Sequence, residues 1–280
     1  MVSMKKILVT GAGGYIGRHV VTSLLEMGAE VLACDFRLDG VDNRAIKLQK
    51  DIFLNDHDIY NTLGKPDACL HMAWKDGFVH NSDAHMEQLS NHYRFIYNMI
   101  EGGLQQIAVM GTMHEIGYYE GAIDENTPSN PISMYGIAKD ALRRSTCLLS
   151  KSKPIIWQWL RAFYIYGDDK KNNSIFAKIV LAEERGDKTF PFTTGKNMYD
   201  FIHVHDLARM LAACVMQDEV TGIINCCTGK PVSLAEQVEK FIRDHGFKIK
   251  LEYGAFPDRS YDSPAIWGNS TKIQEIIWKG

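Results

Sequence analysis

The sequence has few of the features that mark secreted, membrane-spanning or nucleic-acid-binding proteins. Its 280 residues include six scattered cysteines and no Cys-x-x-Cys pair, so neither a disulfide framework nor a zinc ribbon is indicated. No uninterrupted apolar stretch is long enough to span a bilayer, and the apolar run at residues 5–9 is too short for a signal peptide. The formal net charge is −3 and no basic block occurs, which argues against nucleic-acid binding. We therefore expect a cytoplasmic globular protein with reduced core thiols and without a metal site.

A glycine-rich turn near the start of the chain is the most informative motif. Residues 7–9 form an apolar run typical of a buried parallel strand, and residues 19–27 have the pattern of a helix that Gly28 ends. Between these segments lie Gly11, Gly14 and Gly17. Because glycine has no Cβ, such a turn can press backbone N–H groups against a pyrophosphate, helped by the positive end of the helix dipole. The order of strand, turn and helix predicts a dinucleotide-binding site.

An acidic residue at the end of the second predicted strand supports this interpretation. Residues 30–34 are mostly apolar, and Asp35 follows them, 18 residues after Gly17. A carboxylate at this place accepts hydrogen bonds from both ribose hydroxyls of NAD and repels the 2′-phosphate of NADP. Arg37 could pair with a 2′-phosphate, so we predict NAD with NADP as the alternative. The glycines alone would also fit an ordinary tight turn, and Asp35 alone a solvated loop acid.

Apolar strands alternate with helical patterns through the first 165 residues, which predicts a parallel sheet with helices on both faces. The further segments are strands at 45–48, 67–73, 106–110 and 155–160, and helices at 54–63, 86–101 and 133–149. The predicted fold class is α/β, a Rossmann-type doubly wound parallel sheet with a smaller C-terminal substrate-binding lobe. We assign 1–165 and 198–228 to the Rossmann domain, and 166–197 and 229–280 to the smaller lobe.

Three side chains near the expected carboxyl edge of the sheet form a candidate catalytic group. Thr112 follows the fifth strand, and Tyr135 and Lys139 lie four residues apart on one face of the next helix. A nearby ammonium and a positively charged nicotinamide both favour phenolate, so the pKa of Tyr135 should fall below its usual value of about 10. The phenol then exchanges a proton with a substrate oxygen that Thr112 orients. The same spacing recurs at Tyr166 and Lys170, where a glycine and two aspartates break the helical pattern.

Taken together, the motifs resemble the extended short-chain dehydrogenase/reductases, the NAD-dependent epimerase/dehydratase group that acts on nucleotide sugars. The likeness covers nearly the whole chain. The residues that carry it are 10–17, Asp35, Asp51-Ile52, 71–73, Thr112 with Gly117, 135–139, Leu160-Arg161 before Tyr166-Gly167, and 200–206.

The resemblance implies how a cofactor would be held. Asp51 and Ile52 would contact adenine, and Ala73 would lie beside the cofactor. Lys139 would also hold the nicotinamide ribose, with Phe163 near the nicotinamide. The implied cofactor-binding set is Gly11, Gly14, Tyr15, Ile16, Gly17, Asp35, Asp51, Ile52, Ala73, Lys139 and Phe163.

The resemblance also implies contacts to a nucleotide-sugar substrate. Asn173 would bind the diphosphate and Arg259 a phosphate, although a surface ion pair is the alternative for Arg259. His114 would face the substrate as a second acid/base group, and its alternative is a solvated loop histidine. Family members often dimerise through a four-helix bundle that includes the Tyr-Lys helix, so a homodimer is expected.

The sequence departs from the family pattern in the substrate region. Sugar 4,6-dehydratases carry an acidic pair directly after the threonine, but Met113 and His114 stand there, with Glu115 one residue further. Dehydration is therefore not predicted. Tyr164 stands where many members have asparagine, and Tyr199 where many have arginine, so the sugar and the base stay open.

These observations predict an NAD(P)-dependent oxidoreductase on a nucleotide-diphosphate sugar, with reduction of a 4-keto-6-deoxy sugar at C4 as the favoured reaction. The chain is short for the family's epimerases and lacks the dehydratase acids, which favours a reductase. One alternative is a nucleotide-sugar C4 epimerase with bound NAD. Another, from a different class, is a non-catalytic NAD(P)-sensing protein, against which the intact set Thr112, Tyr135 and Lys139 argues.

Overall fold

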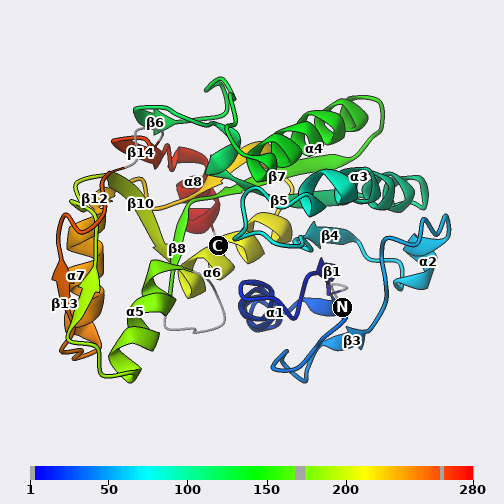
Figure 1. Ribbon diagram of the computed structural model, residues 1–280. Helices are drawn as coiled ribbons and strands as arrows, with labels where there is room; N and C mark the ends of the chain where they lie inside the picture. The colour runs from blue at the N-terminus through cyan, green and yellow to red at the C-terminus, as the bar shows by residue number, and fades with distance from the viewer. Residues whose placement is uncertain (1–3, 168–173, 259–261, 280) are drawn as a thin grey trace.

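The chain folds around a seven-stranded parallel sheet with helices on both faces (Figure 1). The computed structural model describes residues 4–167, 174–258 and 262–279. The strands of this sheet are β1 (Lys6–Thr10), β2 (Glu30–Cys34), β3 (Ile46–Leu48), β4 (Ala68–His71), β5 (Gln106–Thr112), β7 (Ile156–Ala162) and β11 (Gly222–Cys226). Their order is β11-β7-β5-β4-β1-β2-β3, which reverses direction between β1 and β4. The predicted Rossmann-type fold class is thereby confirmed.

Helices cover the two faces of this sheet, and the side-chain alternation of the strands explains how. α3 (Ala84–Glu101) and α4 (Met134–Lys151) lie on one face, and α1 (Gly17–Glu26) and α6 (Val204–Met216) on the other (Figure 1). Along β1, Ile7 and Val9 enter the core beneath α1 and α6, whereas Leu8 enters the core beneath α3 and α4. All three are fully buried. Two shorter helices, α2 (Ile59–Thr62) and α8 (Thr271–Lys279), pack at the margins.

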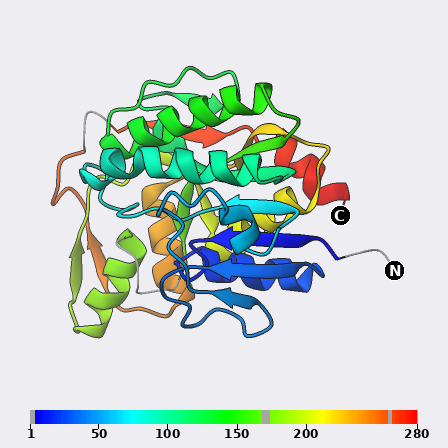
Figure 2. The same cartoon turned by 90° about the vertical axis from the view of Figure 1, so that its right-hand side faces the viewer.

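A second, smaller sheet lies on the side towards which β1 runs from the N-terminus (Figure 2). Its path is β12 (Pro231–Ser233), β10 (Met198–His203), β14 (Ala265–Gly268) and β6 (Gly121–Ile123), and β8 (Tyr164–Tyr166) pairs with β10. The elements beside it are α5 (Ile175–Glu184), α7 (Leu234–Asp244) and the strand pair β9 (Thr189–Pro191) and β13 (Lys250–Glu252). A third core cluster, in which phenylalanine rings pack edge-on against one another, holds this part together. Within residues 198–228, α6 and β11 join the large sheet while β10 belongs to the small one.

The helix predicted over 54–63 forms only at its end, as α2. Asp51 and Asp56 each accept a hydrogen bond from the backbone N–H two residues further on, at 2.9 and 2.8 Å. Asn55 has a positive φ of 54°. These local turns compete with helix formation, so the prediction was wrong for the first half of the segment. The short strands β6, β8, β9, β12 and β14 have too few residues to show a period, and the sequence does not predict them.

Candidate active site

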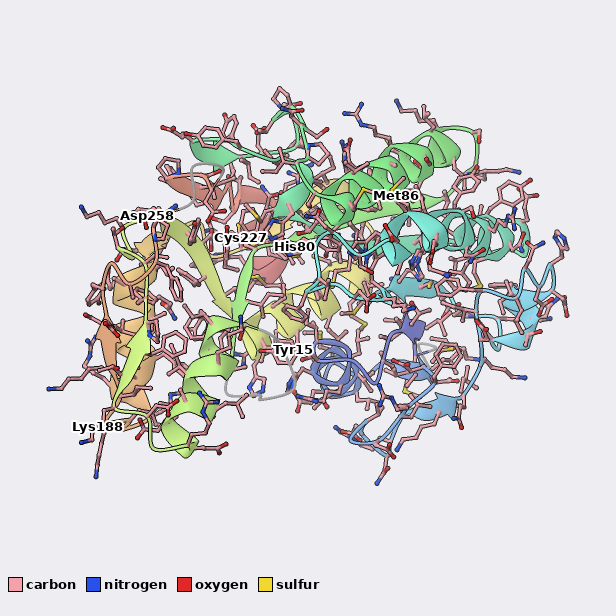
Figure 3. The ribbon with its side chains drawn as sticks, in the orientation of Figure 1. Tyr15, His80, Met86, Lys188, Cys227 and Asp258 are labelled. Carbon is pink, nitrogen blue, oxygen red and sulfur yellow. The ribbon has the colours of Figure 1, made fainter. Side chains whose placement is uncertain are left out.

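The carboxyl ends of neighbouring strands bring the predicted residues to one edge of the large sheet. Thr10 at the end of β1 pairs with Cys34 of β2 on one side and with His71 of β4 on the other. His71 in turn pairs with Val109 of β5. The features at these strand ends are the glycine turn, Asp35, Ala73 and Thr112. Figure 3 labels Tyr15 just before α1 and His80 on the loop after β4. In a parallel sheet this edge is where ligands bind.

The glycine turn is packed so closely that a side chain does not fit at Gly11, Gly13 or Gly17. A Cβ on Gly17 would lie 2.1 Å from the carbonyl oxygen of Gly11, and a Cβ on Gly13 would lie 1.8 Å from the carbonyl oxygen of Arg37. Sequence reasoning missed Gly13, although its place inside the glycine spacing is a usable signal. The turn therefore presents bare backbone, as a pyrophosphate cradle requires.

Asp35 is fixed beside this turn by two backbone hydrogen bonds. Its Oδ2 accepts the N–H of Gly13 at 3.0 Å, and its Oδ1 accepts the N–H of Phe36 at 2.7 Å. A carboxylate has about four acceptor sites, so both oxygens keep capacity for a ribose hydroxyl. The placement fits the predicted role of Asp35, which stays a prediction.

Thr112, Tyr135 and Lys139 come together where β5 ends and α4 begins. The Thr112 hydroxyl lies near enough to the Tyr135 phenol to lower the pKa of that phenol. The Lys139 Nζ donates to the carbonyl oxygen of Met110 at 2.7 Å and lies 5.9 Å from the centre of the Tyr135 ring. Ser133 caps α4 by accepting a backbone N–H of the first turn at 3.1 Å, which fixes the start of the helix. The three predicted catalytic side chains thus share one site.

Burial controls the protonation of Tyr135 and Lys139. It raises the pKa of Tyr135 to about 12, and the Thr112 hydroxyl opposes that shift. Burial also lowers the pKa of Lys139 to about 7, which the carboxylate of Glu115 opposes. With the chain's own groups the phenol is therefore protonated at neutral pH, the reverse of the expected lowering. The expectation included a nicotinamide charge and stays a prediction for the complex.

Three histidine rings border the Tyr135 ring, and the nearest is that of His85, with centroids 5.3 Å apart. The His80 ring stacks on Tyr135 with centroids 5.5 Å apart, and the His114 ring lies 4.4 Å from His80 and 6.2 Å from Tyr135. The carbonyl oxygen of His80 also accepts the N–H of Tyr135 at 2.9 Å. Burial, with a contribution from His80, lowers the pKa of His114 to about 3. His114 is thus a neutral hydrogen-bonding group near pH 7, which does not favour its predicted acid/base role. His80 was missed, although it follows a strand end.

Glu115 is not available as an acid for water elimination. It ends the short 3-10 turn η1 (Met113–Glu115) and is fully buried. Its Oε1 accepts the Arg161 Nε–H at 2.7 Å, and its Oε2 accepts the Trp159 Nε1–H at 2.9 Å. Because Arg161 is itself 1% exposed, the two charges neutralise each other inside the core. This arrangement agrees with the expectation that the protein is not a dehydratase.

The two substrate-region departures from the family pattern are in contact with each other. Tyr164 on β8 and Tyr199 on β10 stack with ring centroids 4.1 Å apart and an interplanar angle of 24°. Tyr164 also lies 6.2 Å from the ring of His114, which links the pair to the catalytic group. Burial raises the pKa of Tyr164 well above its usual value, so this phenol is uncharged. Aromatic surface therefore replaces the family's amide and cation at these positions.

Three further predicted cofactor residues, Asp51, Ile52 and Phe163, have contacts that do not define a role. Ile52 is buried, and Phe163 is buried against Gly268. The carboxylate of Asp51 accepts the N–H of Phe53 at 2.9 Å. Their assignment to a cofactor stays a prediction. The predicted residues outside the described ranges are Asn173 and Arg259, together with Lys170.

Within residues 4–167, 174–258 and 262–279, no group of three or more His, Cys, Asp and Glu side chains is placed to hold a metal ion. In the same ranges no helix combines the length and the apolar character needed to cross a bilayer. The six cysteines are free thiols, five of them buried, which is compatible with the predicted cytoplasmic location. That location stays a prediction.

A chain of buried polar groups lies beneath the site. The Thr10 Oγ1 accepts the N–H groups of Met72 and Ala73 at 3.1 and 3.3 Å, so its own proton points to the His71 Nδ1, 2.8 Å away. The His71 Nε2–H then donates to the His92 Nδ1 at 2.9 Å. Burial lowers the pKa of His71 to about 3 and also lowers that of His92. Both imidazoles are therefore neutral, each in a defined tautomer.

Comparison with known proteins shows the family to which the chain belongs. The model of the NAD dependent epimerase/dehydratase family matches residues 7–227. A dTDP-6-deoxy-L-talose 4-dehydrogenase (NAD(+)) from Aggregatibacter actinomycetemcomitans is 44% identical over 269 residues, which cover 94% of this chain and 98% of that protein. A UDP-glucose 4-epimerase from Halalkalibacterium halodurans is 26% identical, over 97% of this chain and 89% of that protein. Among solved structures, one similar protein is UDP-glucuronic acid 4-epimerase from Bacillus cereus in complex with UDP-glucuronic acid and NAD. Its TM-score is 0.81 at 20% identity, and the match covers 98% of this chain and 93% of that chain. That last likeness shows the fold.

The buried histidine pair predicts a specific loss of stability in acid. Because the pKa values of His71 and His92 lie below the unfolded value of about 6.5, the unfolded chain binds more protons as pH falls. Each histidine should then lower the free energy of unfolding by about 1.4 kcal/mol between pH 7.5 and 5.5. Urea unfolding at both pH values measures this. In His92→Gln, the difference in the free energy of unfolding between the two pH values should be smaller by about 1.4 kcal/mol. In His57→Gln, at an exposed histidine, this difference should equal that of the wild type. Equal pH differences in all three proteins would contradict the prediction.

Proposed function

The chain belongs to the NAD-dependent epimerase/dehydratase family, and on that basis we propose that it interconverts the C4 hydroxyl and the C4 ketone of a dTDP-linked 6-deoxyhexose. The observation that carries the proposal is the meeting of Thr112, Tyr135 and Lys139 at the edge of the sheet, with the buried Lys139 Nζ 5.9 Å from the centre of the Tyr135 ring. The 44% identity to a dTDP-6-deoxy-L-talose 4-dehydrogenase (NAD(+)) supports the choice of sugar and nucleotide.

The glycine turn and Asp35 fit NAD. A Cβ at Gly13 or Gly17 would meet backbone atoms, so the turn offers N–H groups without side chains to a pyrophosphate. The carboxylate of Asp35 is held beside the turn, where it would accept both adenosine ribose hydroxyls and repel a 2′-phosphate. Lys139 is the residue that would hold the nicotinamide ribose. When bound, NAD exchanges a hydride with the sugar at C4.

The chain's own residues move the proton that accompanies this hydride. In the reducing direction Tyr135 donates its phenolic proton to the C4 oxygen while the C4–H bond forms, and Thr112 hydrogen-bonds the same oxygen. The raised pKa of Tyr135 keeps that proton in place. In the oxidising direction Tyr135 takes the proton from the C4 hydroxyl, and the positive charge of Lys139 stabilises the phenolate. One set of groups serves both directions.

The direction predicted from the sequence is reduction, and the name of the 44% identical relative describes oxidation by NAD(+). These are opposite directions of the same proposed reaction. C4 epimerisation is the second candidate, because UDP-glucose 4-epimerases are among the relatives. The stacked Tyr164 and Tyr199 favour the first candidate, since aromatic surface suits the methyl group of a 6-deoxy sugar better than a hydroxymethyl group.

An assay in both directions tests the proposal. With NAD⁺ and dTDP-6-deoxy-L-talose, we expect one NADH per sugar oxidised. With NADH and the corresponding 4-keto sugar, we expect one NADH consumed per sugar reduced, and NADPH should be less effective because of Asp35. Absorbance at the NADH band and chromatography of the sugars measure both. Interconversion of UDP-glucose and UDP-galactose without net NADH would indicate an epimerase. Binding of NAD without turnover of any of these sugars would overturn the proposal.

Tyr135→Phe should lower kcat by about 10²- to 10⁴-fold, because the ring stays and only the exchanged proton is lost. Affinity for NAD, measured by calorimetry, should stay nearly unchanged. Tyr118→Phe is the matched control, since this tyrosine is 48% exposed and its hydroxyl bonds Glu120 at the surface. Retention of more than about a tenth of wild-type kcat by Tyr135→Phe would remove Tyr135 from its role.

We propose in addition that two copies of the chain pair through α3 and α4, which lie side by side (Figure 1). Met86 and Tyr97 on α3, and Ile137 and Leu148 on α4, are 42, 39, 40 and 66% exposed. Adjacent helices that both expose apolar side chains provide a self-complementary surface for a two-fold, four-helix interface.

Leu148→Lys should convert a dimer to a monomer, because two copies of the introduced charge would be buried close together at the interface. Sedimentation equilibrium at micromolar protein concentration measures the mass. Leu54→Lys is the control, since Leu54 is 74% exposed outside these helices and should not change the mass. A wild-type protein that sediments as a monomer would show that α3 and α4 do not pair two copies.

A further inference from the structure

Trp74 stands at the centre of a group of contacts that the proposed mechanism does not use. It follows Ala73 on the loop after β4 and is half-buried. The Lys139 Nζ lies 3.8 Å from the centroid of its indole ring. The His92 ring is also stacked on the indole, with centroids 4.3 Å apart and an interplanar angle of 14°. Trp74 also meets the Tyr135 ring edge-on at 6.0 Å.

The orientation of the indole is fixed by hydrogen bonds. The His85 Nε2 lies 2.9 Å from the carbonyl oxygen of Val79, which can only accept, so Nε2 carries the proton. The His85 Nδ1 is then the acceptor for the Trp74 Nε1–H at 3.0 Å. On the other side, the chain from Thr10 through His71 sets the orientation of His92, on which the indole stacks. The ring plane therefore cannot turn without breaking these contacts.

The ring faces a cation with few other partners. Lys139 is 3% exposed, and its ammonium donates to the carbonyl oxygen of Met110. The negative face of an indole stabilises an ammonium at this distance by about 0.5 to 2 kcal/mol, the upper end when water is excluded. The ring therefore counteracts the burial that lowers the pKa of Lys139 to about 7.

We propose that Trp74 is a positioning residue whose indole face holds the Lys139 ammonium beside Tyr135 and favours its charged form. The inference rests on the proposed function for its catalytic consequence, though not for its electrostatic one. The charge matters because a positive neighbour makes the phenolate form of Tyr135 less costly when the C4 hydroxyl gives up its proton.

The other ionisable groups that interact with Lys139 lie on η1, β4, α3 and α4. Glu115 on η1 contributes a negative charge that favours the ammonium. His71 on β4 and His92 on α3 are neutral because burial lowers their pKa values. Tyr135 on α4 is protonated in the chain by itself. His71, His92 and Tyr135 keep their charge between pH 7 and 9 in the chain by itself, because their pKa values lie outside that range. Lys139, with its pKa lowered to about 7, titrates at the lower end of the range.

The catalytic test compares Trp74→Leu, which removes the aromatic side chain, with Trp74→Phe, which keeps one aromatic ring and loses the fused pyrrole ring with its Nε1–H. The readout is the pH profile of kcat/KM for sugar oxidation. Trp74→Leu should move the basic limb, on which Lys139 loses its proton, downward by about 0.5 to 1 pH unit, since 1.36 kcal/mol corresponds to one unit. Activity near pH 8 should then fall about three- to tenfold and approach the wild-type value near pH 6. Trp74→Phe should keep most of the wild-type position.

A merely structural role for Trp74 would lower kcat/KM by the same factor at every pH, and an unmoved limb in Trp74→Leu would overturn the proposal. Phe53→Leu is the control, because Phe53 packs edge-on against His92 at 4.8 Å and is not among the contacts of Lys139. It should leave the limb in place. If Trp74→Leu does not fold, Trp74→Met fills more of the space without an aromatic face and gives the same comparison.

A second measurement needs no substrate, so it separates failure of this inference from failure of the proposed function. The ring stabilises Lys139 only while the lysine is charged, which is below about pH 7. The unfolding equilibrium constants of Trp74→Leu and Trp74→Phe, from urea melts, should therefore differ about three- to tenfold more at pH 6 than at pH 8.5. A difference that does not depend on pH would overturn the proposal even in an active enzyme.

Discussion

The burial of one positive charge, the ammonium of Lys139, is the constraint on which the site depends. An unpaired ammonium in a water-excluded place costs several kcal/mol or loses its proton. The groups that reduce this cost come from separate elements: the carbonyl of Met110 on β5, the indole of Trp74 after β4, and the more distant carboxylate of Glu115 on η1. The lysine can stay charged beside Tyr135 only while the register of the large sheet holds these elements together. Because the Lys139 ammonium is removed from water, its charge depends on the folded arrangement of these elements.

Glu115 shows how the same core also limits the chemistry. Its carboxylate satisfies Arg161 and Trp159 deep under the loop that carries Thr112, and Arg143 approaches it at 3.8 Å. Removing one member of such a group leaves an unpaired buried charge, which is among the most destabilising changes in a protein. The loop after β5 is therefore rigid for electrostatic reasons. The carboxylate three residues after Thr112 thus serves as a buried counter-ion.

The sequence was sufficient for features that depend on local patterns. The glycine turn, Asp35 after the second strand and the four-residue spacing of Tyr135 and Lys139 follow from periodicity and from the rule that parallel strands end at one edge. The positions of Trp74 and His80 did not follow, because the loop after β4 has no period and its contacts join residues about 60 positions apart. The inward direction of Glu115 and the raised pKa of Tyr135 depend on burial, which spacing does not reveal.

The stacking of Tyr164 on Tyr199 makes two distant positions in the sequence a single unit in evolution and in engineering. Restoring the family's asparagine at one position would place an amide against an aromatic face, and restoring the arginine at the other would press a guanidinium onto a buried phenol. Each single exchange therefore passes through an intermediate with a mismatched pair, and their energetic effects are not additive. An evolutionary lineage that alters its sugar specificity at Tyr164 and Tyr199 is expected to change both residues together or neither.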